Sequence, residues 1–201
     1  MSNNIYVLTK LFSLIFTIPL LTACFGNPAP VPQDYFYTLP DNKISTATSK
    51  AVYSSLSVDK IRATGIYNER DILYLHKTKP LSIQRYHYHH WTMPPAQLIQ
   101  QQIKAYLTAN HVANQVMDYS PATKTAGVIR GTLLQFEQLI DGKNYSVGVS
   151  IELDFKSATK HHVKRYVVQT PAKDSSIHAS AAAFGEAVEE IMQRFVKDIN
   201  N

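Results

Sequence analysis

The chain has 201 residues, which is enough for one folded domain and too few for two comfortable ones. Apolar residues make up 45% of it and charged residues 17%, which excludes a largely disordered chain because this apolar content can offset the entropy of ordering. The formal net charge of +5 is spread along the chain, so it suits an anionic membrane surface or an acidic partner and argues against a nucleic-acid-binding stripe.

The first 23 residues are typical of a bacterial export signal. They contain no Asp or Glu, carry Lys10 near the start and continue with an apolar stretch over residues 11–20. That stretch has the length of a signal-peptide core and is short for a membrane-spanning helix. We therefore assign residues 1–23 to a lipoprotein signal peptide.

The only cysteine of the chain follows this segment, in the sequence Leu21-Thr22-Ala23-Cys24. A small residue before a cysteine matches the bacterial lipobox, in which the thiol receives diacylglycerol before cleavage. A signal anchor, or a secreted protein with a chance cysteine, is the alternative. Because the one cysteine occupies the one position that the motif requires, we predict cleavage between Ala23 and Cys24 and lipidation of Cys24. Two or three acyl chains such as palmitate, at about 0.8 kcal/mol per buried CH₂, would anchor the mature protein.

The residues after the cysteine predict a tether and a destination. An Asp at the next position tends to retain lipoproteins in the inner membrane, so Phe25 favours the periplasmic face of the outer membrane. Three prolines between residues 28 and 32 favour polyproline II and oppose a packed element. Residues 24–33 are therefore expected to form an acylated, Pro-rich tether, whose segment from residue 26 onward reaches roughly 25 Å.

Residues 34–201 carry the patterns of one folded domain. Strands are expected at 35–39, 56–61, 72–77, 81–91, 112–117, 127–140, 145–155 and 163–170, and a Ser/Thr-rich loop at 41–50. The clearest strand is 145–155, where apolar and polar residues alternate as in an antiparallel strand with one face in a core. Two amphipathic helices are expected, from Pro94 to about Asn110 and from Ser175 or Ser176 to Ile199.

These patterns predict the α+β class, with a single twisted, largely antiparallel sheet packed with two amphipathic helices. The simplest packing places both helices on one face of the sheet. The alternative places one helix on each face, and the sequence does not choose between them.

The sequence contains few candidates for metal-binding or catalytic residues. His87 and His89 would share one face of a strand, which is a workable two-ligand spacing, but a metal site needs three or four ligands and no carboxylate stands close by in sequence. Cross-strand packing of His and Tyr is the favoured interpretation, and a histidine-based metal-binding protein stays an alternative. Glu152 and Asp154 form a carboxylate pair of the kind that solvated strand faces commonly carry. Without a Gly-x-Ser-x-Gly elbow, a second Cys or a phosphate-binding loop, the sequence predicts no enzyme and no cofactor.

The order of motifs along the mature chain resembles a known family. The lipobox is followed by Tyr35-Phe36-Tyr37-Thr38-Leu39-Pro40, by Ile66-Tyr67-Asn68-Glu69-Arg70-Asp71-Ile72, by a Tyr-rich strand running into Trp91 and Pro94-Pro95, by Gly131-Thr132-Leu133-Leu134-Gln135-Phe136-Glu137 and by an Ala-rich final helix. Each motif is loose by itself, and their order carries the weight. This order resembles the auxiliary lipoproteins of ABC-type transport systems, a group that includes the Pqi-type outer-membrane lipoproteins, over nearly the whole mature chain.

The resemblance implies a function. Members of this group accompany an inner-membrane ABC transporter and an MCE-type periplasmic protein, which together are thought to move lipids or other hydrophobic compounds between the membranes. Residues 34–201 would then be a non-enzymatic, periplasmic ABC-transport auxiliary component domain that docks the assembly at the outer membrane. Some members form rings, so the resemblance also implies a homo-oligomer. Another outer-membrane assembly or structural lipoprotein is the alternative function.

Overall fold

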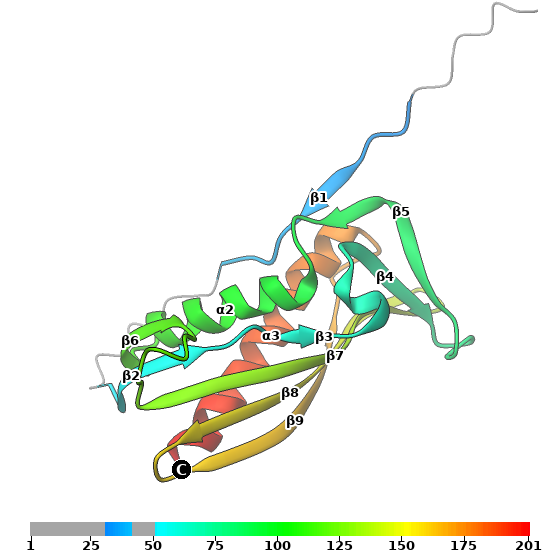
Figure 1. Ribbon diagram of the computed structural model, residues 1–201. Helices are drawn as coiled ribbons and strands as arrows, with labels where there is room; N and C mark the ends of the chain where they lie inside the picture. The colour runs from blue at the N-terminus through cyan, green and yellow to red at the C-terminus, as the bar shows by residue number, and fades with distance from the viewer. Residues whose placement is uncertain (1–30, 42–50) are drawn as a thin grey trace, which may run out of the picture. The chain divides into compact units, whose positions relative to one another are not determined.

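Nine strands, two α-helices and one short 3₁₀ helix (η1) make up the part of the chain that the computed structural model describes, residues 31–41 and 51–201 (Figure 1). The predicted signal peptide, Cys24 and most of the predicted 41–50 loop lie outside the described residues. The elements are β1 (Tyr35–Tyr37), β2 (Tyr53–Val58), β3 (Arg62–Ala63), η1 (Gly65–Asn68), β4 (Asp71–His76), β5 (Ile83–Trp91), α2 (Pro95–Ala109), β6 (Ala113–Asp118), β7 (Gly127–Asp141), β8 (Asn144–Ser157), β9 (His161–Pro171) and α3 (Ile177–Asn200).

The long strand β7 organises the sheet. One of its edges pairs with β8 in antiparallel register from Gly127 opposite Ser157 to Asp141 opposite Asn144, and β8 pairs in turn with β9. The other edge receives three short strands in succession, β2, β3 and β4, all parallel to β7. Three further strands lie outside these, with β6 beside β2, β5 beside β4 and β1 beside β5.

The sheet is therefore mixed, which corrects the prediction of a largely antiparallel sheet. Five strand pairings are parallel (β1 with β5, β2 with β6 and with β7, β3 with β7, and β4 with β7), while β4–β5, β7–β8 and β8–β9 are antiparallel. The alternation of apolar and polar residues fixes which face of a strand is buried, but it carries no information about strand direction. The α+β class itself is confirmed.

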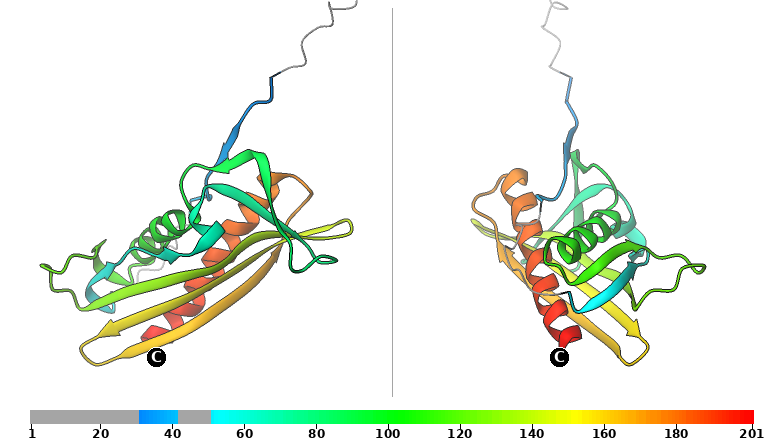
Figure 2. Two further views of the ribbon diagram at one scale, coloured as in Figure 1. Left: turned by 45° about the vertical axis from the view of Figure 1, so that its right-hand side comes forward. Right: turned by 90° about the vertical axis from the view of Figure 1, so that its left-hand side faces the viewer.

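Both helices pack on the same face of the sheet, as the simplest packing predicts. α3 lies against β8 and β9, while α2 contacts α3, β2, β6 and β7 (Figure 2). Apolar side chains of the two helices meet those of β8 around Ile103, Ile151 and Ile191, and the cavity left among them measures only about 10 Å³. No helix in the described part of the chain combines the length and apolarity needed to cross a bilayer.

An aromatic cluster joins both halves of the sheet to the last helix. Phe136 of β7 stacks on Phe184 of α3 with ring centroids 4.1 Å apart, and Trp91 of β5 lies 5.5 Å from each of them. All three side chains are fully buried. Because they come from three elements far apart in the chain, this cluster stabilises the tertiary arrangement rather than any single element.

Replacing Phe184 with Ala is expected to lower the free energy of unfolding by about 3–5 kcal/mol, because a buried ring is lost and its neighbours relax only partly into the space. Chemical denaturation measures this change. The matched control is Val163→Ala on β9, where the side chain is exposed and the expected change is within about 0.5 kcal/mol. Equal effects of the two variants would contradict the assigned core.

Polar contacts fasten the end of α3 to β9. The Asp198 carboxylate accepts hydrogen bonds from Lys164 Nζ and from the Tyr166 hydroxyl, both at 2.8 Å. Lys160 Nζ donates to the backbone carbonyls of Asp198 and Ile199. These carbonyls lie in the last turn of α3, where no backbone N–H of the helix is available to them. The bond from Lys164 and then that from Tyr166 hold the pKa of the Asp198 carboxyl below its usual range, while burial raises the pKa of Tyr166.

The lowered pKa of Asp198 predicts a pH-dependent contribution to stability. A carboxyl whose pKa is lower in the folded than in the unfolded chain stabilises the fold above its unfolded pKa of about 3.9, and this contribution is lost as the pH falls through the folded pKa. Asp198→Asn is expected to cost about 1–2 kcal/mol at pH 7 and less at pH 3, measured by urea unfolding at both values. Asp141→Asn, at a more exposed ion pair, is the control; an Asp198→Asn cost that does not shrink at pH 3 would argue against this role.

Candidate functional site

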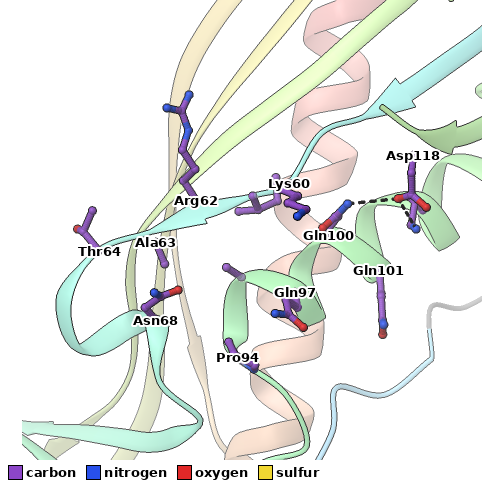
Figure 3. A pocket seen from close by; sticks show the side chains of 13 residues that line it. Lys60, Arg62, Ala63, Thr64, Asn68, Pro94, Gln97, Gln100, Gln101 and Asp118 are labelled. Atoms are coloured by element: carbon purple, nitrogen blue, oxygen red, sulfur yellow. Dashed lines mark hydrogen bonds and ion pairs between the residues drawn. The ribbon is translucent and has the colours of Figure 1, made fainter. Parts of the chain in front are cut away.

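A groove of about 660 Å³ opens where β3 and η1 pass the N-terminal half of α2 (Figure 3). Its volume lies in the range of ordinary ligand pockets. Three basic side chains line it, Lys60, Arg62 and Lys104. Four side-chain amides accompany them, Asn68, Gln97, Gln100 and Gln101. The groove therefore offers hydrogen-bond donors and acceptors together with positive charge.

The positive charge of the groove is only partly neutralised. Its one lining carboxylate, Asp118, accepts hydrogen bonds from Lys104 Nζ at 2.7 Å and from Gln100 Nε2 at 3.3 Å. In the described residues, no carboxylate lies within ion-pair distance of the Lys60 ammonium or the Arg62 guanidinium. The lining residues carry three cations and one carboxylate, so positive charge predominates in and beside the groove, which favours a ligand with negative charge.

The local chain path builds this groove. After β2 the Asp59 N–H donates to the Ile129 carbonyl at 2.8 Å, and Ile61 is buried, so the short strand β3 lies against β7. Gly65 then adopts a φ of +59°, a left-handed conformation that favours glycine and turns the chain into η1. Asn68 at the end of η1 reaches the groove from the side opposite Lys60 (Figure 3).

A buried carboxylate fixes η1 in place. Glu137 on β7 is 3% exposed and accepts hydrogen bonds from the Tyr67 hydroxyl at 2.8 Å, from Gln135 Nε2 at 2.8 Å and from the Phe136 N–H at 3.1 Å. Burial, and then the neighbouring Glu137 carboxylate, raise the pKa of Tyr67, so its hydroxyl remains a donor at neutral pH. The wall of the groove thus depends on one polar network under it.

Tyr67→Phe removes a donor to this buried carboxylate and is expected to lower the free energy of unfolding by about 1–3 kcal/mol. Backbone amides of residues 65–68 should also exchange with solvent faster, because η1 loses its attachment to β7. Hydrogen exchange and chemical denaturation test both effects. Tyr88→Phe, at a half-exposed tyrosine of β5, serves as the control; similar exchange at residues 65–68 in the two variants would refute the role of Tyr67.

The histidine-rich stretch lies in β5, where its members contact aromatic residues and acids. His89 stacks on Tyr35 with ring centroids 5.3 Å apart, and its Nδ1 lies 3.0 Å from the Tyr37 hydroxyl. His90 Nδ1 lies 3.2 Å from Asp71 Oδ1 and its Nε2 lies 3.7 Å from Asp34. Sequence reasoning missed these carboxylates because β4 and β1 bring them from other parts of the chain.

Across residues 31–41 and 51–201, no three His, Cys, Asp or Glu side chains are placed so as to share a metal ion. His89 contacts Tyr35 and Tyr37, and Tyr is not among the usual ligands of zinc, which are Cys, His, Asp and Glu. The packing of His and Tyr between strands that the sequence favours is thus present, with β1 as the partner strand of β5.

The two acidic residues predicted as a pair on β8, Glu152 and Asp154, lie beside different neighbours. Asp154 Oδ1 lies 2.9 Å from His161 Nε2, while Glu152 is exposed opposite Arg165 of β9. Both lie on the face of β8 that points away from α3. The predicted cleavage site and lipidation site, Ala23 and Cys24, lie outside the described residues.

Comparison with a family model shows the family of this chain, and solved structures share its fold. The family model described as ABC-type transport auxiliary lipoprotein component matches residues 37–196, a span that contains the whole groove. Protein XCC0632 from Xanthomonas campestris is similar in structure, with a TM-score of 0.67 at 15% identity over 81% of this chain and 92% of that chain. A crystal structure of an uncharacterized protein gives a TM-score of 0.68 at 12% identity over 83% and 99%. These low identities show the fold alone, and no curated protein sequence matches the chain.

Proposed function

The chain belongs to the family of ABC-type transport auxiliary lipoprotein components, and from this premise we propose that it is a membrane-anchored docking partner of an MCE-type system that moves lipids or other hydrophobic compounds. The family is one of transport auxiliaries and not a known enzyme class. The observation that carries the proposal is the family match, which extends over nearly all of the folded domain, from residue 37 to 196.

The interior of the domain supports docking rather than carriage of the compound. The layer between the helices and β8 is filled by side chains such as Ile99, Val149 and Met192, and the cavity there is about 10 Å³. A space of this size holds about one water molecule and is far too small for an acyl chain. The large groove lies at the surface instead and is lined with charged and amide side chains. Such a surface suits recognition of another macromolecule.

The proposed lipid anchor determines at which membrane, and how far from it, this surface can meet a partner. If Cys24 is acylated, the tether of residues 24–33 keeps the domain, which begins at Asp34, within a few tens of ångströms of the bilayer. Phe25 directs the protein to the outer membrane in this proposal. The domain would then meet the periplasmic end of a transport assembly that starts at the inner membrane.

Replacement of Cys24 by Ala is expected to abolish labelling by an alkyne analogue of palmitate, because the acylated thiol is gone. Phe25→Asp should keep the label and move the protein from the outer- to the inner-membrane fraction. Labelling followed by sucrose-gradient separation of the membranes measures both. Labelled Cys24→Ala protein would refute lipidation at this residue, and labelled Phe25→Asp protein that stays in the outer membrane would refute the sorting role of Phe25.

Affinity purification of the full chain from detergent-solubilised envelope tests the docking role. An MCE-type protein and subunits of an ABC transporter are the expected partners. Recovery of outer-membrane assembly factors alone would reject docking in favour of the alternative, an assembly or structural lipoprotein. The mass of the purified protein in the same detergent tests the predicted homo-oligomer.

A further inference from the structure

One edge of β3 has no neighbouring strand in the described part of the sheet. Along β7, β2 pairs at residues 127–129, β3 at 132–133 and β4 at 138–140. β2 carries β6 on its other edge and β4 carries β5, whereas β3 pairs only with β7 in the part of the chain that the structure describes. The position between the end of β6 and the end of β5 is therefore open, and we call it the β3 slot.

The groove described above occupies this slot. Its lining runs from Asp118, the last residue of β6, past Arg62 and Ala63 of β3 to Asn68 and Pro94 (Figure 3). Alternate residues of a strand in parallel pairing direct their N–H and C=O groups to opposite edges. β3 therefore presents backbone groups to the slot, and among the described residues no hydrogen bond is made across that edge.

We infer that the β3 slot binds an extended, acidic segment of a partner protein, which adds to β3 as a further strand. Addition of a strand to an open sheet edge is a common mode of peptide recognition, with main-chain hydrogen bonds giving affinity and flanking side chains giving specificity. The slot supplies both, because β3 offers the edge while the amides of Gln97, Gln100 and Gln101 line the other wall.

The positive charges beside the β3 slot favour an acidic segment as its ligand. Lys60 and Arg62 have no carboxylate partner among the described residues, while the Asp118 carboxylate already accepts from Lys104. In Figure 3 the Lys60 side chain extends toward Gln100 and that of Arg62 extends away from α2, so the two cations do not converge on one point. Separated cations fit acidic side chains spaced along a strand better than they fit a single phosphate group.

This inference rests on the proposed function only for the identity of the partner. Binding to the slot is tested without that partner, so the two proposals fail separately. Loss of peptide binding would leave recovery of an MCE-type protein untouched, and failure to recover that protein would leave peptide binding untouched.

The probe is a fluorescein-labelled hexapeptide of alternating glutamate and valine, titrated against the full chain in a non-ionic detergent. Fluorescence anisotropy gives the affinity, and amide chemical shifts give the place of binding. We expect shifts at residues 62–64, and at least a tenfold weaker affinity for the variant Lys60→Glu/Arg62→Glu. Both substituted side chains are exposed, so the fold should be retained.

A variant and two peptides provide matched controls. Lys156→Glu/Arg165→Glu makes the same change of charge on the outer face of β8 and β9 and should bind the probe within a factor of two of the natural chain. Lysine in place of glutamate, or N-methylation of alternate backbone amides, should abolish binding. The inference is overturned if the N-methylated peptide binds equally well, if the two variants weaken binding equally, if shifts fall only outside the slot, or if the probe does not bind at millimolar concentration.

Discussion

The pairing of β7 with other strands along both of its edges determines how the rest of the structure is arranged. Fourteen of the fifteen residues of β7 pair with β8 on one side, and residues 127–129, 132–133 and 138–140 pair with three separate strands on the other. A shift of one residue in this register would turn every buried side chain of β7 to the opposite face. At Gly131 an added Cβ would lie 2.9 Å from the side-chain ends of Ile61 and Leu153, so a side chain there would require both neighbours to shift.

β7 contains an irregularity, beyond which its side chains contribute both to the core and to the wall of the groove. The register with β8 shifts between Leu133 and Gln135, as at a β-bulge. Beyond the shift, Gln138 is completely buried, accepts a hydrogen bond from the Tyr86 hydroxyl at 2.6 Å and donates to Ser180 Oγ at 2.6 Å, which links β5, β7 and α3. Its neighbour Glu137 faces the other way and holds η1. One strand thus fixes both the core and the wall of the groove.

The sequence predicts the parts of this fold that depend on local patterns. The alternation at 145–155, the strands at 72–77 and 81–91 and the apolar stripes of both helices all correspond to elements of the structure. Ser176 caps α3 by accepting a hydrogen bond from the Ala179 N–H. The parallel pairings could not be predicted, because they join strands distant in the chain and no periodicity encodes direction.

The candidate site was harder to predict than the fold. β3 has two residues and η1 has four, so both are too short for a strand or helix periodicity to be recognised in the sequence. The predicted strand over 56–61 also joins the end of β2 to the residues that lead into β3. In the sequence Glu137 stands out only as part of a family motif, because no local pattern indicates that an acid on a strand will be buried. Lys60 and Arg62 stand out only in the structure, where no carboxylate of the described residues lies within ion-pair distance of either side chain.

The function that we infer for the domain is recognition of a partner through the open edge of β3, rather than catalysis or enclosure of a ligand. A photoreactive benzophenone side chain at the exposed Thr64, which lines the groove, tests it most directly when irradiated in intact cells. We expect a crosslink from Thr64 to an acidic segment of an MCE-type protein or another transport component, and no such product from Thr159 in the β8–β9 turn. A crosslink to that component from Thr159 and none from Thr64 would contradict it.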